Sequence, residues 1–215
     1  MRFVVEQLGA RRDYAVPMIL QQAGMLERFY TDLAGNVGRG RWLAKIGCLL
    51  GCRAAAERLA GRRVPDSLRE KTVCFGGIKT WLEASRLFGR RNPANAFRRQ
   101  LRVSQALGRS MARRGFGTAT HLYSMLGECS PLLAAAKRSG IKIVTEFYIL
   151  LSAERILALE QRAFPQWAPP PPDLDAVRAE FPDEQNVIAR TDFALCPSEA
   201  VQVDLEENFG FGKGR

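Results

Sequence analysis

With 215 residues, 47% of them hydrophobic and 25% charged, the chain has the length and balance of one soluble globular domain, whereas disordered chains hold far fewer apolar side chains. No apolar run approaches the ~20 residues of a membrane-spanning helix, and Phe3-Val4-Val5 is too short for a signal peptide, which together predict a cytoplasmic protein. The formal net charge of +10 favours an anionic partner, and the 5 scattered cysteines favour reduced thiols over a disulfide framework.

The first residues predict a strand, a helix and a second strand. Residues 2–8 have the pattern of a strand. Apolar side chains then recur at helical spacing over residues 16–23, with Asp13 placed to cap the helix and Gly24 to end it. The second strand covers residues 26–31. Such a unit implies that the two strands pair in parallel.

The segment that follows is strongly basic. Residues 39–115 hold 19 basic and 4 acidic side chains, so this segment alone carries a charge of +15. Such a charge fits a solvated surface, or a surface that attracts phosphates, anionic lipid or nucleic acid. Within the segment, residues 39–60 have the pattern of an amphipathic helix, which would pack on the protein or contact a membrane. Its apolar stripe consists of Trp42, Leu43, Ile46, Leu49 and Leu50.

Strands and helices alternate through the rest of the chain. The pattern predicts further strands over residues 71–75, 119–124, 141–145 and 193–196. It predicts helices over residues 80–88, 92–114, 132–139, 152–164 and 173–190, an extended proline run over 169–172, and a last helix after Ser198. Ser130 and Pro131 form an N-cap and first-position pair. The alternation predicts one α/β domain over residues 1–215, an open, mostly parallel, doubly wound (Rossmann-like) sheet with helices on both faces.

Candidate binding residues follow from this fold, because an open parallel sheet binds ligands beyond the carboxyl ends of its strands. The rule selects Gly9, Arg11, Arg12, Asp13, Tyr14, Tyr123, Ser124, Glu146, Tyr148, Ser198 and Glu199. The loop after the first strand lacks both G-x-G-x-x-G and Walker A patterns, which argues against a dinucleotide or ATP. Arg11 and Arg12 at a helix start would suit a phosphate or carboxylate, or are simply solvated.

Catalytic and metal-binding patterns are otherwise few. The only histidine, His121, lies inside a predicted strand, where a packed, hydrogen-bonded side chain is the common outcome. No G-x-S-x-G nucleophile elbow occurs. Cys48 and Cys52 are four residues apart, but zinc needs about four ligands and no other cysteine or histidine clusters nearby. We therefore predict no metal site and assign no catalytic residue.

Three segments carry a family resemblance. The first is Arg-Arg-Asp-Tyr-Ala-Val-Pro at residues 11–17, after the glycine-containing turn. The second is residues 120–124, a helix, and then residues 140–145. The third, and most specific, is Thr-Asp-Phe-Ala-Leu-Cys-Pro-Ser-Glu at residues 191–199, with its helix behind it. Together, over nearly the whole chain, they resemble the N-terminal domain of family-4 (group-1) glycosyltransferases of the GT-B fold.

The resemblance implies transfer of a sugar from a nucleoside-diphosphate sugar to an acceptor hydroxyl, usually with retention of configuration and without an obligatory metal. In that fold the N-terminal domain mainly holds the acceptor, while a second Rossmann-like domain binds the donor and carries a paired-glutamate E-x7-E motif. The chain would then be an acceptor-binding half, inactive alone and without a cofactor of its own, whose donor domain is absent or separate.

Two details of the sequence bear on this resemblance. The E-x7-E spacing occurs at Glu146 with Glu154 and at Glu199 with Glu207, but without the glycine-rich surroundings of the donor motif, and we interpret both as coincidences. The family often has a histidine at the end of the 141–145 strand, where this chain continues Glu-Phe-Tyr.

The partner implied by the resemblance is a glycan or a lipid-linked acceptor, as in the synthesis of bacterial surface polysaccharide or glycolipid. A lipid-linked acceptor would make the basic segment 39–115 a peripheral face at the inner side of a membrane. Two alternatives stay open. One is a non-catalytic α/β module that holds an anionic ligand or a partner protein at the same sheet edge. The other, nucleic-acid binding, is weaker because the arginines lack interleaved aromatic side chains.

Overall fold

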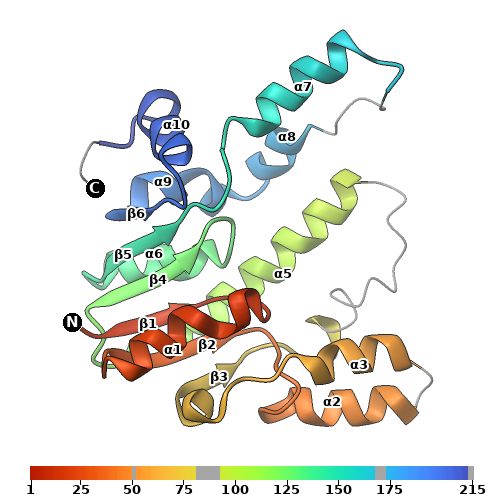
Figure 1. Ribbon diagram of the computed structural model, residues 1–215, viewed down its shortest axis with the longest axis vertical. Helices are drawn as coiled ribbons and strands as arrows, with labels where there is room; N and C mark the ends of the chain where they lie inside the picture. Colours follow the sequence, from red (N-terminus) through yellow and green to blue (C-terminus); the bar gives the residue numbers. More distant parts are fainter. Residues whose placement is uncertain (50–51, 81–92, 168–172, 213–215) are drawn as a thin grey trace.

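Six parallel strands form one open sheet, as the computed structural model of the chain shows (Figure 1). The structure describes residues 1–49, 52–80, 93–167 and 173–212. The proline run and nearly all of the helix expected over 80–88 lie outside the described residues. The strands are β1 (Phe3–Glu6), β2 (Leu26–Thr31), β3 (Thr72–Cys74), β4 (His121–Met125), β5 (Lys142–Glu146) and β6 (Phe193–Leu195).

Helices and short 3-10 turns connect these strands. The helices are α1 (Ala15–Gln22), α2 (Gly38–Leu49), α3 (Arg53–Gly61), α5 (Pro93–Arg114), α6 (Ser130–Arg138), α7 (Ala153–Ala163), α8 (Leu174–Ala179), α9 (Val187–Arg190) and α10 (Glu199–Phe209). The 3-10 turns are η1 (Arg11–Tyr14), η2 (Asp66–Lys71) and η3 (Pro182–Asn186).

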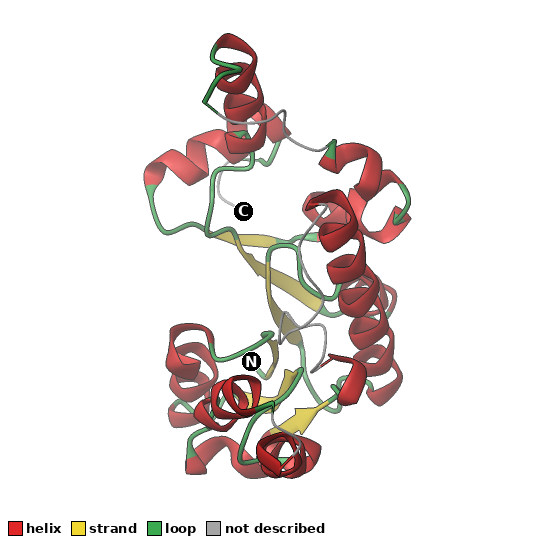
Figure 2. Cartoon of the chain, turned by 90° about the vertical axis from the view of Figure 1, so that its right-hand side faces the viewer, coloured by secondary structure: helices red, strands yellow, loops and turns green. Residues whose placement is uncertain are grey.

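The core lies on both faces of the sheet, since neighbouring residues of a strand point to opposite sides. Val4 and Leu122 belong to a cluster with Leu107 of α5 and Leu132 of α6. Val5 and Tyr123 belong to the cluster on the other face, where partly buried residues of α1 and Leu68 of η2 cover them. Figure 2 shows the twisted sheet with helices on either side. Burial on both faces explains why apolar residues follow one another directly within the strands, as in Phe3-Val4-Val5 and Phe29-Tyr30.

The strand order is β3-β2-β1-β4-β5-β6, and every neighbouring pair is parallel. This order confirms the predicted open, doubly wound, Rossmann-like α/β fold. The chain first winds outward from β1 to β3 and then returns to place β4 on the other side of β1. The point between β1 and β4 is therefore the topological switch of the sheet, where the loops after these strands run to opposite sides.

Two predicted helix caps are wrong. Asp13 does not cap α1, because the chain forms turn η1 and the N-cap position is taken by Tyr14, which has no side-chain cap hydrogen bond. Ser130 lies inside α6, and the N-cap position is Cys129. The backbone N–H of Cys129 donates to Ser104 Oγ of α5 at 2.8 Å, so the amino end of α6 is satisfied by another helix.

The amphipathic helix predicted over residues 39–60 is replaced in the structure by two shorter helices, α2 and α3. Leu50 of the predicted apolar stripe lies outside the described residues, and the other four side chains are only partly buried. Leu43 packs against a small cluster between the two helices, whereas Trp42 is 61% exposed and Leu49 is 85% exposed. Much of the stripe therefore faces outward. Among the described residues, no helix has the length and apolar character to cross a bilayer.

The contact between α5 and the start of α6 is close because residue 108 is glycine. A Cβ atom added at Gly108 would lie 2.9 Å from the carbonyl oxygen of Cys129 and 2.9 Å from Cδ of Pro131. Both neighbours belong to the segment that leads from the carboxyl end of β4 into α6. The close approach of α5 to the start of α6 thus depends on the absence of a side chain at residue 108.

We predict that Gly108→Ala lowers the free energy of unfolding by about 1–3 kcal/mol, the usual cost of overpacking, although alanine is the better helix former. Gly61→Ala, at the end of α3, is the matched control because nothing lies within 4 Å of its added Cβ. This control should leave stability unchanged or raise it. Urea denaturation measures both changes, and a stabilised Gly108→Ala variant would contradict the close contact.

Candidate functional site

The loop after β1 makes an unusual turn at the carboxyl edge of the sheet. Gly9 has a φ of +75°. In η1, three successive non-glycine residues are also left-handed: φ is 49° at Arg12, 49° at Asp13 and 63° at Tyr14. Such left-handed residues cost about 1–2 kcal/mol each and occur mostly where function or packing requires them. The amide of Gln7 supports the turn, since its Nε2 donates to the carbonyl oxygen of Arg11 at 2.7 Å.

The turn brings two arginines to carboxylates on neighbouring strands. Nη2 of Arg11 lies 2.8 Å from Oε1 of Glu128, which follows β4, and Arg12 pairs with Glu146, the last residue of β5. The arginine side chains are 40% and 54% exposed, whereas the two carboxylates are 6% and 5% exposed. The acids thus lie inside the edge and the guanidinium groups cover them.

Glu6, the last residue of β1, is fully buried at the switch beside β4. Oγ of Ser124, its neighbour on β4, donates to Glu6 Oε2 at 2.6 Å. In the described part of the chain, Glu6 forms no ion pair. Burial, and then the negative charge of Glu128, raise the pKa of Glu6 well above its ordinary value. The structure therefore favours the neutral acid at this position.

Glu128, which follows β4, is a second buried carboxylate of the edge with a raised pKa. Burial raises its pKa to about 7, against the opposing effects of the Leu8 amide and the Arg11 guanidinium. The backbone N–H of Leu8 donates to Glu128 Oε2 at 2.8 Å, which ties the loop after β1 to the loop after β4. A carboxylate with a pKa in this range can accept a proton from a ligand at neutral pH.

Two tyrosines complete the edge on the β5 side. The hydroxyl of Tyr123 donates to Oε2 of Glu146, and burial followed by this hydrogen bond raises the pKa of Tyr123. The guanidinium of Arg11 lies over the ring of Tyr148, 5.2 Å from its centroid. Glu146 thus contacts both Arg12 and Tyr123, and the tyrosine stays a hydrogen-bond donor at any physiological pH.

Asp32, directly after β2, anchors the other side of the turn. Its Oδ1 accepts from the backbone N–H of Gly9 at 2.9 Å, and its Oδ2 pairs with Nη1 of Arg62 at 3.1 Å. Arg62 follows α3 and lies beside Gly9, where a Cβ atom would meet its guanidinium at 3.8 Å. We use the name carboxyl-edge cluster for Glu6, Arg11, Arg12, Asp32, Arg62, Tyr123, Ser124, Glu128, Glu146 and Tyr148.

The residues predicted from the sequence separate into two groups. Gly9 and six others lie in or against the carboxyl-edge cluster, namely Arg11, Arg12, Tyr123, Ser124, Glu146 and Tyr148. Tyr14 is only 2% exposed and packs edge-on to Phe29 in the core, and burial raises its pKa to about 12. Asp13 is exposed. Ser198 and Glu199 are exposed beyond β6, two strands away from β4 in the sheet.

Four members of the cluster were missed from the sequence: Glu6, Asp32, Arg62 and Glu128. Asp32 follows the second strand directly, so the rule of carboxyl ends, applied to that strand as well, would have selected it. Glu6 is a charged residue directly after the apolar run Phe3-Val4-Val5, where a buried carboxylate is a signal of a special site. Arg62 reaches the cluster from a helix end, and no local pattern predicts that contact.

Other groups considered from the sequence lie elsewhere. His121 begins β4 at the opposite, amino edge, with its ring 4.9 Å from that of Phe3 and its Nδ1 2.8 Å from Oγ1 of Thr120. Burial lowers its pKa. Over the part of the chain that the structure describes, no group of three or more His, Cys, Asp and Glu side chains could hold a metal ion.

Comparison with known proteins adds no assignment. No protein family, no curated protein and no solved structure matches this chain. Since a Rossmann-like fold alone hosts many activities, function has to be argued from the groups at the carboxyl edge.

The raised pKa of Glu128 predicts a pH dependence of stability. The folded protein holds a proton that the unfolded chain releases above pH 4.5, so the free energy of unfolding falls as pH rises from about 4.5 to 7. The contribution of this group is on the order of 3 kcal/mol. Glu128→Gln should flatten the fall, as measured by urea denaturation at pH 5 and pH 8.

The control is Glu160→Gln, which removes one exposed carboxylate from α7. This variant should keep the dependence of the original protein. A stability that is the same at both pH values in the original protein, or a fall that survives unchanged in Glu128→Gln, would show that Glu128 titrates normally.

Proposed function

We propose that the chain is the acceptor-binding domain of a glycosyltransferase, which moves a sugar from a nucleoside-diphosphate sugar to a hydroxyl of a glycan or lipid-linked acceptor. The observation that carries this proposal is the carboxyl-edge cluster at the switch between β1 and β4. Ligands of open parallel sheets bind at such a switch. The resemblance of the chain to family-4 glycosyltransferases supplies the reaction.

The chemistry of the cluster suits hydroxyl groups. Carboxylates accept hydrogen bonds from sugar hydroxyls. The hydroxyl of tyrosine and the guanidinium of arginine donate hydrogen bonds to sugar oxygens. Glu146 stands between Arg12 and Tyr123, so all three kinds of group meet at one point of the edge. A ligand hydroxyl could take the place of one of these partners without leaving a buried charge unpaired.

The same contacts bear on the alternative, a non-catalytic module for an anionic ligand. In that alternative, Arg11 and Arg12 would bind the phosphate. Each of them, however, already pairs with a buried carboxylate. A phosphate would have to compete with Glu128 and Glu146 and would lie close to their charges. At this edge, then, the neutral acceptor is the better supported ligand, and an anion needs another surface of the molecule.

The proposed transfer requires a second domain. The acceptor oxygen forms a bond to the sugar carbon as that carbon loses its bond to the nucleoside diphosphate, and the hydroxyl proton passes to a base. The donor and its diphosphate would be held by the separate donor-binding domain that the resemblance implies. The chain alone would bind the acceptor without turning it over, in the cytoplasm or at the inner face of a membrane.

We predict that the chain binds an oligosaccharide or glycolipid on a glycan array, and that calorimetry shows much weaker binding of UDP-glucose and GDP-mannose. Glu146→Gln and Tyr123→Phe should weaken binding of the array ligand roughly tenfold each, the usual loss for a charge-assisted hydrogen bond.

Lys142→Gln is the matched control, because Lys142 begins the strand that Glu146 ends and is exposed at the amino edge. Its affinity should match that of the original protein. Tight binding of a nucleotide sugar without any glycan binding, or equal losses in Lys142→Gln and Glu146→Gln, would refute acceptor binding at this edge.

A further inference from the structure

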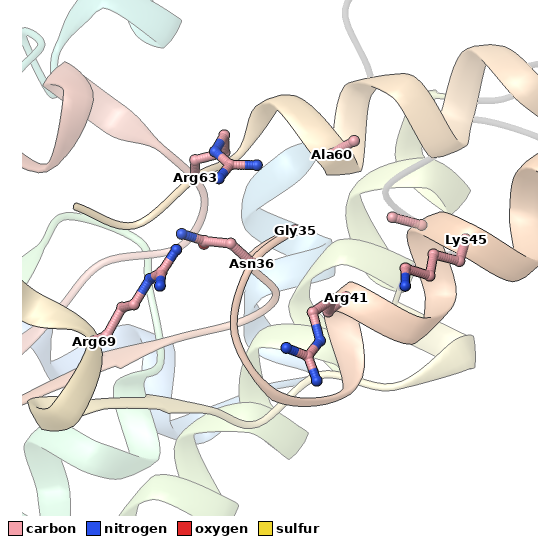
Figure 3. A pocket seen from close by; sticks show the side chains of 8 residues that line it. Gly35, Asn36, Arg41, Lys45, Ala60, Arg63 and Arg69 are labelled. Carbon is pink, nitrogen blue, oxygen red and sulfur yellow. The ribbon is translucent and has the colours of Figure 1, made fainter. Parts of the chain in front are cut away.

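A pocket of about 440 Å³ lies beyond the carboxyl end of β2, outside the carboxyl-edge cluster. Figure 3 shows Arg41 and Lys45 on α2, Arg63 just after α3 and Arg69 on η2, around the loop that carries Gly35 and Asn36. The lining residues are Gly35, Asn36, Arg41, Ala44, Lys45, Ala60, Arg63 and Arg69. Four of them are cations and none is a carboxylate.

The backbone around this pocket is fixed. The side chain of Asn36 both donates to the carbonyl oxygen of Val64, at 2.7 Å, and accepts from its backbone N–H, at 2.9 Å. The backbone N–H of Gly35 donates to the carbonyl oxygen of Arg62 at 2.7 Å. These three hydrogen bonds join the loop after β2 to the segment after α3 on either side of Arg63. The loop at Gly35 and Asn36 and the segment that carries Arg63 are therefore held together on one side of the pocket.

Its positive charge is largely uncompensated. Arg69 pairs with the exposed Asp66 at 3.0 Å. Among the described residues, Arg41, Lys45 and Arg63 form no ion pair, and α2 contains no acidic residue. Three exposed cations around one hollow create a site for a doubly charged oxyanion, because each can donate to a phosphate oxygen. A neutral sugar carries no negative charge that could pair with these cations.

The helix that supplies two of the cations also exposes large apolar side chains. Trp42, Ile46 and Leu49 are spaced by four and three residues, so they share one face of α2, and they are 61%, 46% and 85% exposed. The ammonium of Lys45 lies 5.8 Å from the ring centroid of Trp42. A helix with an aromatic and aliphatic face beside a cationic face is the arrangement of helices that lie in a membrane interface.

We propose that this pocket binds the phosphate of an anionic phospholipid at a bilayer surface, while Trp42, Ile46 and Leu49 enter the interface. Arg41, Lys45 and Arg63 hold the phosphate, and Asn36 positions the loop between them. The anionic surface matches the charge of the pocket, and the acyl region matches the apolar face of α2. A soluble phosphate would satisfy the cations and leave the apolar face in water.

This inference does not rest on glycan binding, since neither the pocket nor α2 contributes a residue to the carboxyl-edge cluster. The experiment contains no glycan, so its failure leaves the acceptor proposal untouched. Co-sedimentation compares vesicles of phosphatidylcholine with about 40% phosphatidylglycerol, whose anionic surface attracts Lys and Arg side chains, with vesicles of phosphatidylcholine alone.

The pocket variant is Arg41→Gln with Arg63→Gln. Its control is Arg109→Gln with Arg113→Gln, which removes two exposed cations from α5. We expect the original protein to bind only the anionic vesicles. The partition coefficient should fall about tenfold or more in the pocket variant and by much less in the control. Equal losses in the two variants would show unspecific attraction and overturn the pocket, as would no binding by the original protein.

Two further measurements test the apolar contact and the source of the phosphate. Trp42→Ala should weaken vesicle binding severalfold, and the blue shift of tryptophan fluorescence on binding should be absent from it. Glycerol 3-phosphate should bind the free protein far more weakly than the vesicles do. If it binds as tightly, and Trp42→Ala binds vesicles like the original protein, the ligand is a soluble phosphate and the lipid proposal is wrong.

Discussion

The parallel pairing of β1 with β4 is the constraint on which the rest of the structure depends. It joins Val5 to Tyr123 across more than half the length of the chain and makes β1 the neighbour of both β2 and β4. Because of this pairing, Glu6 lies beside Ser124, and the loops after the two strands meet through Leu8 and Glu128. Closing so long a loop costs chain entropy, which burial on both faces of the sheet must offset.

The pairing also explains why charge is tolerated at the carboxyl edge. Glu6, Glu128 and Glu146 are all nearly buried, and a buried carboxylate is costly unless it is paired or protonated. The left-handed turn of η1 supplies two guanidinium groups, and burial raises the pKa of the remaining acid, Glu6, which favours its neutral form. The strained backbone and the acid cluster are thus two parts of one arrangement, which places polar groups where a ligand can reach them.

The sequence predicted the architecture well, because apolar periodicity reports burial directly. The strand over residues 26–31 and the helix over 92–114 agree with β2 and α5 to within one residue. The caps failed because the left-handed conformations of Tyr14 and Cys129 occur without glycine and leave no local signal.

The candidate site was predicted only in part. The rule of carboxyl ends found most of its outer residues, Arg11 and Arg12 among them, because it needs no more than strand boundaries. Their partner Glu128 is known only once the loops are placed in space, and the contact of Arg62 with Asp32 depends on how α3 lies against the sheet.

The two proposed surfaces share a short stretch of chain. Asp32 belongs to the carboxyl-edge cluster, and Asn36, four residues later, belongs to the phosphate pocket. The neighbouring arginines divide in the same way, since Arg62 pairs with Asp32 and Arg63 lines the pocket. A protein held at a bilayer through α2 would therefore keep its carboxyl edge at a fixed position near the lipid surface, where a lipid-linked acceptor would be found.

The most direct measurement of acceptor binding at the carboxyl edge is an amide chemical-shift titration of the labelled protein with the glycan found on the array. We predict that the largest shifts fall on Leu8 and Gly9, whose N–H groups donate to Glu128 and Asp32, and on residues around Glu146. Amides at the amino edge, near His121 and Lys142, should not move. Shifts confined to the amino edge, or to α2 and α3 alone, would contradict it.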